Sequence, residues 1–169
     1  MNGDPQQGKR PVSAVLAGPY GHPFHPILVT VPIGAWVASL VFDLASRFAD
    51  DPEFLVKGSV WLIAIGVLGA LAAATIGFLD LLAIPTGTPA FRTGLLHMTL
   101  NLLVTLAYAI GFVWRQGADT RVAVAAGPLA LSVVALGTLA VSGYLGGKLA
   151  YHYGVRVADE ATQAGGFTH

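Results

Sequence analysis

The sequence contains no cysteine and few charged residues. The absence of cysteine excludes disulfides, thiolate metal sites, directly ligated iron–sulfur clusters and haem attached through thioethers. Only 11% of the 169 residues are charged and 54% are hydrophobic, whereas about 25% are charged in a typical soluble domain. So few charges cannot cover a water-facing surface. The composition therefore indicates a protein whose solvent is lipid.

The chain also lacks an excess of charge of either sign. Nine basic residues balance nine acidic residues. Proteins that bind nucleic acid carry a positive surface that neutralises phosphates, so no nucleic-acid partner is expected. A secretory signal is not expected either, because the apolar segment 12–17 that follows Lys9 and Arg10 is shorter than the hydrophobic region of a signal peptide.

Four long apolar runs, separated by short polar turns, fill most of the chain. Each run has roughly 20 to 27 residues, enough at about 1.5 Å per residue to cross a hydrocarbon core of about 30 Å. Short turns make successive helices alternate up and down. We therefore expect an all-α fold, an integral membrane up–down four-helix bundle over residues 21–157, between polar tails at 1–20 and 158–169. The expected helices cover residues 26–48, 58–84, 94–114 and 122–147.

Two features of the first run predict local structure. Pro32 lies inside the run and predicts a kink, because proline removes a backbone donor and crowds the preceding turn. Asp43 precedes Arg47 by one helical turn. We interpret Asp43 and Arg47 as an ion pair at the membrane interface. The alternative is a buried acid on an ion path.

Small and polar residues also recur at helical spacing in the second and third runs. Gly69, Ala73 and Gly77 recur every fourth residue, which favours close approach of another helix, within the bundle or in a homo-oligomer. In the third run, His97 and Asn101 begin a polar stripe that is expected to face the bundle interior. The tetrapeptide at 27–30 echoes that at 102–105, which hints at an internal repeat of two hairpins.

Up-and-down threading places the start of the first and third helices and the end of the second and fourth helices at one membrane face. We therefore expect five polar side chains from distant parts of the sequence to gather there. They are His22, His25, Asp80, His97 and His152. A histidine near a helix end often only anchors or caps the helix. His97 lies deeper and requires a partner or a ligand.

Three interpretations of this cluster remain open, and the first is a haem b that transfers electrons. Such a haem needs two imidazoles from separate helices and cations for its propionates. His25 and His97 are the expected axial pair, with His22 and His152 as competing candidates. Asn101 or Asp80 is expected to hold an imidazole N–H. The expected propionate partners are Arg92, Lys148 and Arg156.

The second interpretation is a zinc, copper or iron ion bound by nitrogen-rich ligands. Its expected ligands are His22, His25, His97, His152 and Asp80. The third interpretation has no cofactor, and the segment 22–26 then closes the bundle of an accessory subunit or docks a partner. No catalytic constellation stands out, because the serines lack an evident base and no phosphate-binding loop precedes a helix. An electron carrier or binding protein is therefore favoured over a stand-alone enzyme.

Several short motifs resemble a family of uncharacterised four-helix bacterial membrane proteins, a domain of unknown function. They are His-Pro-Phe-His-Pro at 22–26, Gly-Phe-Leu-Asp at 77–80, His97, and the glycine-rich segment 143–147 ahead of Tyr-His-Tyr-Gly-Val at 151–155. Some relatives join this domain to a Rieske-type iron–sulfur domain. The resemblance therefore implies the bundle fold, a redox setting and, since no such domain follows here, a separate electron partner.

The resemblance to bacterial proteins implies a cytoplasmic (inner) membrane location, with the bilayer itself as a partner. Basic residues indicate the orientation, because cytoplasmic loops carry an excess of them. Five lie on the face that holds both termini and four on the opposite face: Lys9, Arg10, Arg92, Lys148 and Arg156 against Arg47, Lys57, Arg115 and Arg121. This difference places both termini on the cytoplasmic side.

Overall fold

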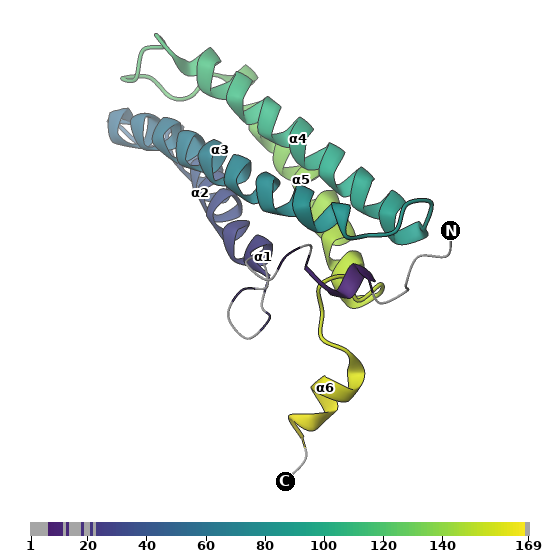
Figure 1. Ribbon diagram of the computed structural model, residues 1–169. Coiled ribbons are helices and arrows are strands. Elements are labelled where there is room, and N and C mark those ends of the chain that lie inside the picture. Colours follow the sequence, from purple (N-terminus) through teal and green to yellow (C-terminus); the bar gives the residue numbers. More distant parts are fainter. Residues whose placement is uncertain (1–6, 12, 14–17, 19–20, 22, 168–169) are drawn as a thin grey trace.

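The computed structural model describes all residues except 1–6, 12, 14–17, 19–20, 22 and 168–169. The described residues form helices and contain no strand. Four membrane-length segments make a bundle, and both chain ends leave it at the same end (Figure 1). In chain order the elements are η1 (Gln7–Lys9), α1 (Phe24–Leu28), α2 (Thr30–Ala45), α3 (Glu53–Leu82), α4 (Pro89–Arg115), α5 (Ala126–Tyr151) and α6 (Glu160–Gly165).

The first membrane segment is two helices rather than one. It breaks at Val29, between α1 and α2. Pro32 explains the break, because it has no backbone N–H and its ring crowds the carbonyl of the residue four positions earlier. The interruption lies where Pro32 predicts one, although Val29 keeps right-handed helical dihedral angles (φ −66°, ψ −17°).

The start of α4 and the end of α5 differ from the ends expected from the apolar pattern. Helix α4 begins at Pro89 because the Thr88 side chain accepts a hydrogen bond from the backbone N–H of Phe91 (3.1 Å) and proline suits the first helical position. Helix α5 continues through its glycine-rich segment to Tyr151. Glycine costs about 0.5–1 kcal/mol in a helix interior, which packing in the bundle offsets here.

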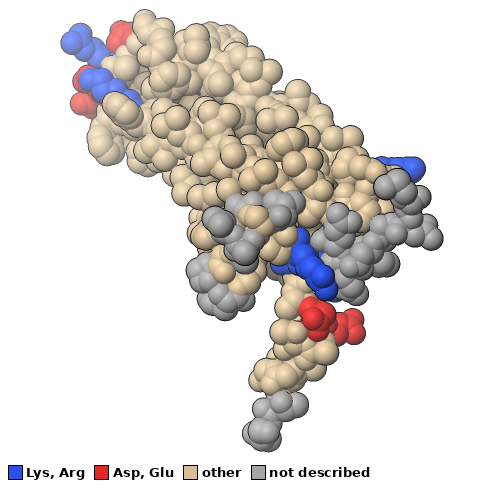
Figure 2. Space-filling view, viewed as in Figure 1, with Lys and Arg blue, Asp and Glu red and all other residues tan. Residues whose placement is uncertain are grey.

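The outer surface of the bundle is apolar along its length. Four segments are long and apolar enough to cross a membrane. On the face shown in Figure 2, charged side chains gather at the two ends and the surface between them carries almost none. Large apolar residues are exposed on every segment, for example Leu68 and Leu103. A soluble protein would bury these side chains, so the membrane bundle expected from composition is confirmed.

Three pairs of residues face one another along the middle of the bundle, one from α1 or α2 and one from α4. The rings of His25 and His97 lie 6.3 Å apart, and those of Trp36 and Tyr108 stack at 4.2 Å with planes 6° apart. At the far end Asp43 and Arg115 form an ion pair. Each pair is separated by 72 positions, from 25 to 97, from 36 to 108 and from 43 to 115.

The partner helices α3 and α5 repeat in the same way, with an offset of 69 positions. His25 and His97 bond the carbonyls of residues 73 and 142. Trp36 and Tyr108 donate to the carbonyls of residues 63 and 132, both at 3.4 Å. The hairpin α1–α3 is therefore structurally equivalent to the hairpin α4–α5. Because equivalent residues meet one another at three levels, the two hairpins are related by an approximate two-fold axis along the bundle.

This repeat has a different register from the one that the sequence suggests. The echo between 27–30 and 102–105 implies an offset of 75 positions, whereas the three facing pairs share an offset of 72. The tetrapeptide echo is therefore in the wrong register, although the repeat exists. The residues that carry it differ in type at two of the three levels.

Candidate functional site

His25 lies at the start of the bundle and is oriented by its own hairpin. Its Nδ1 is 2.9 Å from the carbonyl oxygen of Ala73 on α3. Gly77, one turn further along α3, lies directly under the ring. A Cβ atom added at Gly77 would be 2.8 Å from His25 Cε1, so a side chain there would displace the imidazole. The close approach thus requires glycine, and the spacing of Ala73 and Gly77 serves packing within the bundle.

His97 has the equivalent arrangement in the second hairpin. Its Nδ1 is 2.8 Å from the carbonyl oxygen of Ser142 on α5, and a Cβ atom added at Gly146 would be 3.0 Å from His97 Cε1. Asn101 supports this arrangement, since its amide nitrogen donates to the His97 carbonyl (2.9 Å) and to Ser142 Oγ (2.8 Å). The N–H of the His97 ring is thus held by the Ser142 carbonyl and not by Asn101 as expected, and Asn101 instead holds the His97 backbone and the Ser142 hydroxyl.

The hydrogen bonds fix which ring nitrogen of each histidine carries a proton. A carbonyl oxygen can only accept, so both Nδ1 atoms donate, and a neutral imidazole then carries its lone pair on Nε2. Asn101 Nδ2 also lies 3.2 Å from His97 Nε2, but its two hydrogens are used by the shorter bonds. The two rings face each other at 86°. The structure thus brings together two half-buried imidazoles, each held through Nδ1.

The other residues expected at this face are engaged elsewhere. Asp80 forms a buried ion pair with Arg156, with 2.9 Å between Oδ1 and Nε. His152 is exposed and its ring lies 4.8 Å from that of Tyr153. Lys148 Nζ lies 5.5 Å above the same tyrosine ring, and Arg92 is exposed. His22 lies outside the described residues.

The positions of these side chains show which of the expected haem and metal ligands lie close together. Within the described part of the chain, no group of three or more His, Asp or Glu side chains is arranged to hold a metal ion. The expected convergence of many ligands is therefore reduced, for the described residues, to the pair His25 and His97. Asp80 balances the charge of Arg156, which also adopts a left-handed backbone conformation (φ 58°).

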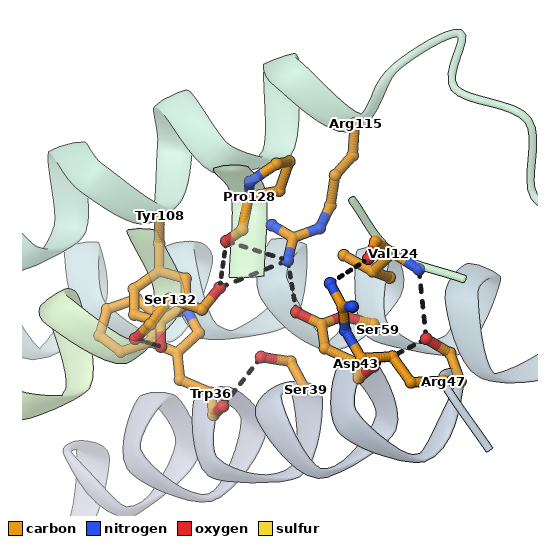
Figure 3. Close-up of polar contacts among 11 residues, drawn as sticks. Trp36, Ser39, Asp43, Arg47, Ser59, Tyr108, Arg115, Val124, Pro128 and Ser132 are labelled. Atoms are coloured by element: carbon orange, nitrogen blue, oxygen red, sulfur yellow. Dashed lines mark hydrogen bonds and ion pairs between the residues drawn. The ribbon is translucent and has the colours of Figure 1, made fainter. Parts of the chain in front are cut away.

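A second polar cluster lies at the opposite end of the bundle. The interpretation of Asp43 and Arg47 as an ion pair is wrong. Asp43 is completely buried and instead pairs with Arg115 on α4, and it also accepts a hydrogen bond from Ser59 on α3 (Figure 3). Arg47 donates to the carbonyl oxygen of Val124 at 3.0 Å. Asp43 is buried because the cation of Arg115, on another helix, reaches it. The spacing of residues along one helix does not reveal such a partner.

Ser132 on α5 and Ser46 complete this cluster. Arg115 Nη2 lies 3.3 Å from Ser132 Oγ, and Ser46 Oγ accepts a hydrogen bond from the backbone N–H of Val124 at 3.2 Å. All four membrane segments thus contribute polar atoms to one buried network. Such a network joins the helices, because a buried polar group without a partner is costly in lipid.

The comparisons with known proteins identify the chain at the level of its family. Residues 21–159 match a family described as predicted membrane protein, DUF2231. The chain belongs to this family. The DUF2231 match begins just before His25 and includes every residue of the two polar clusters. The family expected from the histidine and glycine motifs is thus confirmed. No curated protein and no solved structure matched the chain.

Sequence reasoning missed several residues that shape the two clusters in this DUF2231 member. Ser142, Ser132 and Ser59 are fully or almost fully buried, and their isolated positions in apolar runs were the available signal, since a hydroxyl in lipid needs a partner. Arg115 looked like an ordinary basic residue at a helix end. The shared offset between Trp36 and Tyr108 and between Asp43 and Arg115 was the signal for their pairing.

Proposed function

We propose that this membrane protein binds one haem b between His25 and His97 and carries electrons at the end of the bundle that holds both termini. The observation that supports the proposal is the facing pair of imidazoles, 6.3 Å apart, each from a different hairpin and each held through Nδ1. Histidines that bind metal usually donate their other ring N–H to a backbone carbonyl or a carboxylate in this way.

The two rings would offer one imidazole ligand from each hairpin, with 6.3 Å between their centroids. A bare ion takes three or four protein ligands, whereas a haem needs only two because the macrocycle supplies the others. The described residues offer two imidazoles, which favours haem over a bare zinc, copper or iron ion.

Neighbouring residues have defined roles in this proposal. Ala73 and Ser142 orient the rings through their carbonyls, and Asn101 fixes the position of the Ser142 hydroxyl. Arg156 already balances Asp80, so Arg92 and Lys148 are the cations that remain for the propionates. The haem would supply one-electron chemistry, and a separate redox protein, of Rieske or another type, would be the partner in a bacterial inner membrane.

The proposal is tested by titrating the detergent-purified protein with haemin and recording optical spectra before and after dithionite. We expect a Soret band at one haem per chain that shifts on reduction. His25→Ala and His97→Ala should each abolish stable binding, because one axial ligand is lost. His152→Ala is the matched control and should bind as the unaltered protein does, because His152 is exposed and faces Tyr153.

Two results would contradict the proposal. One is a protein that stays colourless with excess haemin. The other is equal binding by the unaltered protein and by both axial variants. Elemental analysis of the same samples separates the remaining interpretations: stoichiometric zinc or copper in colourless protein would support an ion site, and neither metal nor haem would support an accessory subunit.

A further inference from the structure

Asp80 lies on the face of α3 that holds His25. Ala73 bonds the His25 ring, Gly77 lies under it, and Asp80 follows Gly77 after three residues. Side chains that are three or four residues apart share one face of a helix. The Asp80 carboxylate is close enough to the His25 ring for their charges to interact. The face of α3 that orients His25 therefore also places a carboxylate near it.

Arg156 is held against Asp80 in a strained backbone conformation. Its Nε lies 2.9 Å from Asp80 Oδ1, and the side chains are 6% and 13% exposed. The backbone N–H of Arg156 donates to the carbonyl oxygen of Gly8 at 3.1 Å. Its φ of 58° is one that residues other than glycine rarely adopt. Such strain persists only where the surrounding structure requires the conformation. The fold thus places a cation against Asp80 at a position where glycine would be less strained.

The second hairpin has an uncharged residue at the position equivalent to Asp80. Helices α3 and α5 repeat with an offset of 69 positions. This offset leads from Asp80 to Leu149. His25 and His97 are therefore oriented in the same way, but the ion pair of Asp80 and Arg156 lies on the His25 side alone.

We infer that Asp80 and Arg156 together set the reduction potential of the haem at the histidine pair, an inference that rests on the proposed function. Reduction adds one electron to the iron, with no bond formed or broken, so the charge at the iron falls by one. A negative charge near His25 stabilises the oxidised iron, and a positive charge stabilises the reduced iron. Neither side chain is an axial ligand, so both act through their charge and are positioning residues.

The experiment is an optical redox titration of the haem-loaded protein in detergent. Asp80→Asn leaves the charge of Arg156 uncompensated and should favour the reduced form about tenfold, which raises the potential by about 59 mV for one electron. Arg156→Gln leaves the charge of Asp80 uncompensated and should lower the potential by a similar amount. Opposite signs distinguish this role from a structural one, because a disturbance that only admits water would shift both variants in the same direction.

Three further variants complete the titration. Asp159→Asn is the matched control for loss of an acid, and should leave the potential unchanged because Asp159 is exposed and salt screens its charge. The double variant Asp80→Asn with Arg156→Gln should give a potential between those of the two single variants. Arg156→Gly removes the cation together with the backbone strain and should also lower the potential, which keeps the test decisive if Arg156→Gln folds poorly.

Thermal unfolding of the haem-free protein tests the ion pair separately. Asp80→Asn and Arg156→Gln each leave a buried charge unpaired and should lower the melting temperature. The double variant should recover part of this loss, because no unpaired charge remains. Melting temperatures unchanged in both single variants would mean that the ion pair does not form, and would overturn the inference.

The redox titration separates failure of the inference from failure of the proposed function. If the unaltered protein binds haem but the two single variants shift its potential in the same direction, or not at all, the inference is overturned and the haem site stands. If the unaltered protein binds no haem, the proposed function is wrong and the inference falls with it.

Discussion

The two ends of the bundle are built on the same plan but differ in what their central pair does. At both ends a residue from the first hairpin meets its equivalent, 72 positions later, on the approximate two-fold axis. Asp43 and Arg115 bond each other directly. His25 and His97 instead bond carbonyls of their own hairpins and only face each other.

This difference separates a structural end from the end where we propose that a haem binds. Opposite charges on the axis satisfy each other and join the hairpins where the chain reaches the far face of the membrane. Two identical imidazoles with their lone pairs on Nε2 have nothing to exchange, and a metal between them would satisfy both. The stacked pair of Trp36 and Tyr108 lies between the two levels and packs the middle of the bundle.

Breaking the charged pair should have the largest effect on stability. Asp43→Asn leaves the buried charge of Arg115 uncompensated and should lower the free energy of unfolding by about 3–5 kcal/mol. Thermal and denaturant unfolding in detergent would measure it. Arg47→Ala is the matched control, one turn further along the chain. It should cost only about 1 kcal/mol, because among the described residues the Arg47 side chain bonds a carbonyl oxygen rather than a buried charge. Equal losses would contradict the pairing.

Exchanging the two charges tests whether the positions are equivalent. The double variant Asp43→Arg with Arg115→Asp should recover roughly half of the loss that either single change causes, since buried opposite charges again face each other. Recovery is incomplete because Ser59 and Ser132 are placed for the original polarity. A double variant as unstable as the sum of the two single variants would rule out the two-fold equivalence.

At the histidine end the glycines should be sensitive to small changes. Gly77→Ala and Gly146→Ala each press a Cβ against an imidazole, and should lower the unfolding free energy by about 1–3 kcal/mol, as overpacking does. Gly137→Ala, on α5 with open space around it, should instead raise it by about 0.4–1 kcal/mol. The same unfolding assay measures all three. Gains at all three positions would contradict the close packing.

The smallest loss of unfolding free energy is expected from a change in the middle of the bundle, between the two ends. Tyr108→Phe keeps the stack with Trp36 and removes only the long hydrogen bond with the Ser132 carbonyl. The expected loss is about 0.5–1.5 kcal/mol. Tyr108→Ala, which removes the ring, should cost about 3–5 kcal/mol. A Phe variant as unstable as the Ala variant would show that the hydroxyl, and not the stack, stabilises the middle.

Composition and hydropathy predicted the membrane bundle. Lipid requires long apolar helices, and few other environments do. The His25 and His97 pair was predictable from up-and-down threading, which fixes membrane depth. The partner of Asp43 was not, because depth does not say which helices lie opposite, and the nearest arginine along the helix was the simpler candidate. The register of the hairpin repeat was hidden because Asp43 and Arg115 occupy equivalent positions with opposite charges.

Cysteine cross-linking would test whether His25 and His97 face each other on the axis, because the sequence has no cysteine of its own. His25→Cys with His97→Cys, treated in membranes with a short bis-thiol reagent, should give an intramolecular cross-link in high yield. The control pair, His25→Cys with Ala118→Cys, joins opposite ends of the bundle and should give none. Equal yields from the two pairs, or no product from the first, would show that His25 and His97 do not face each other.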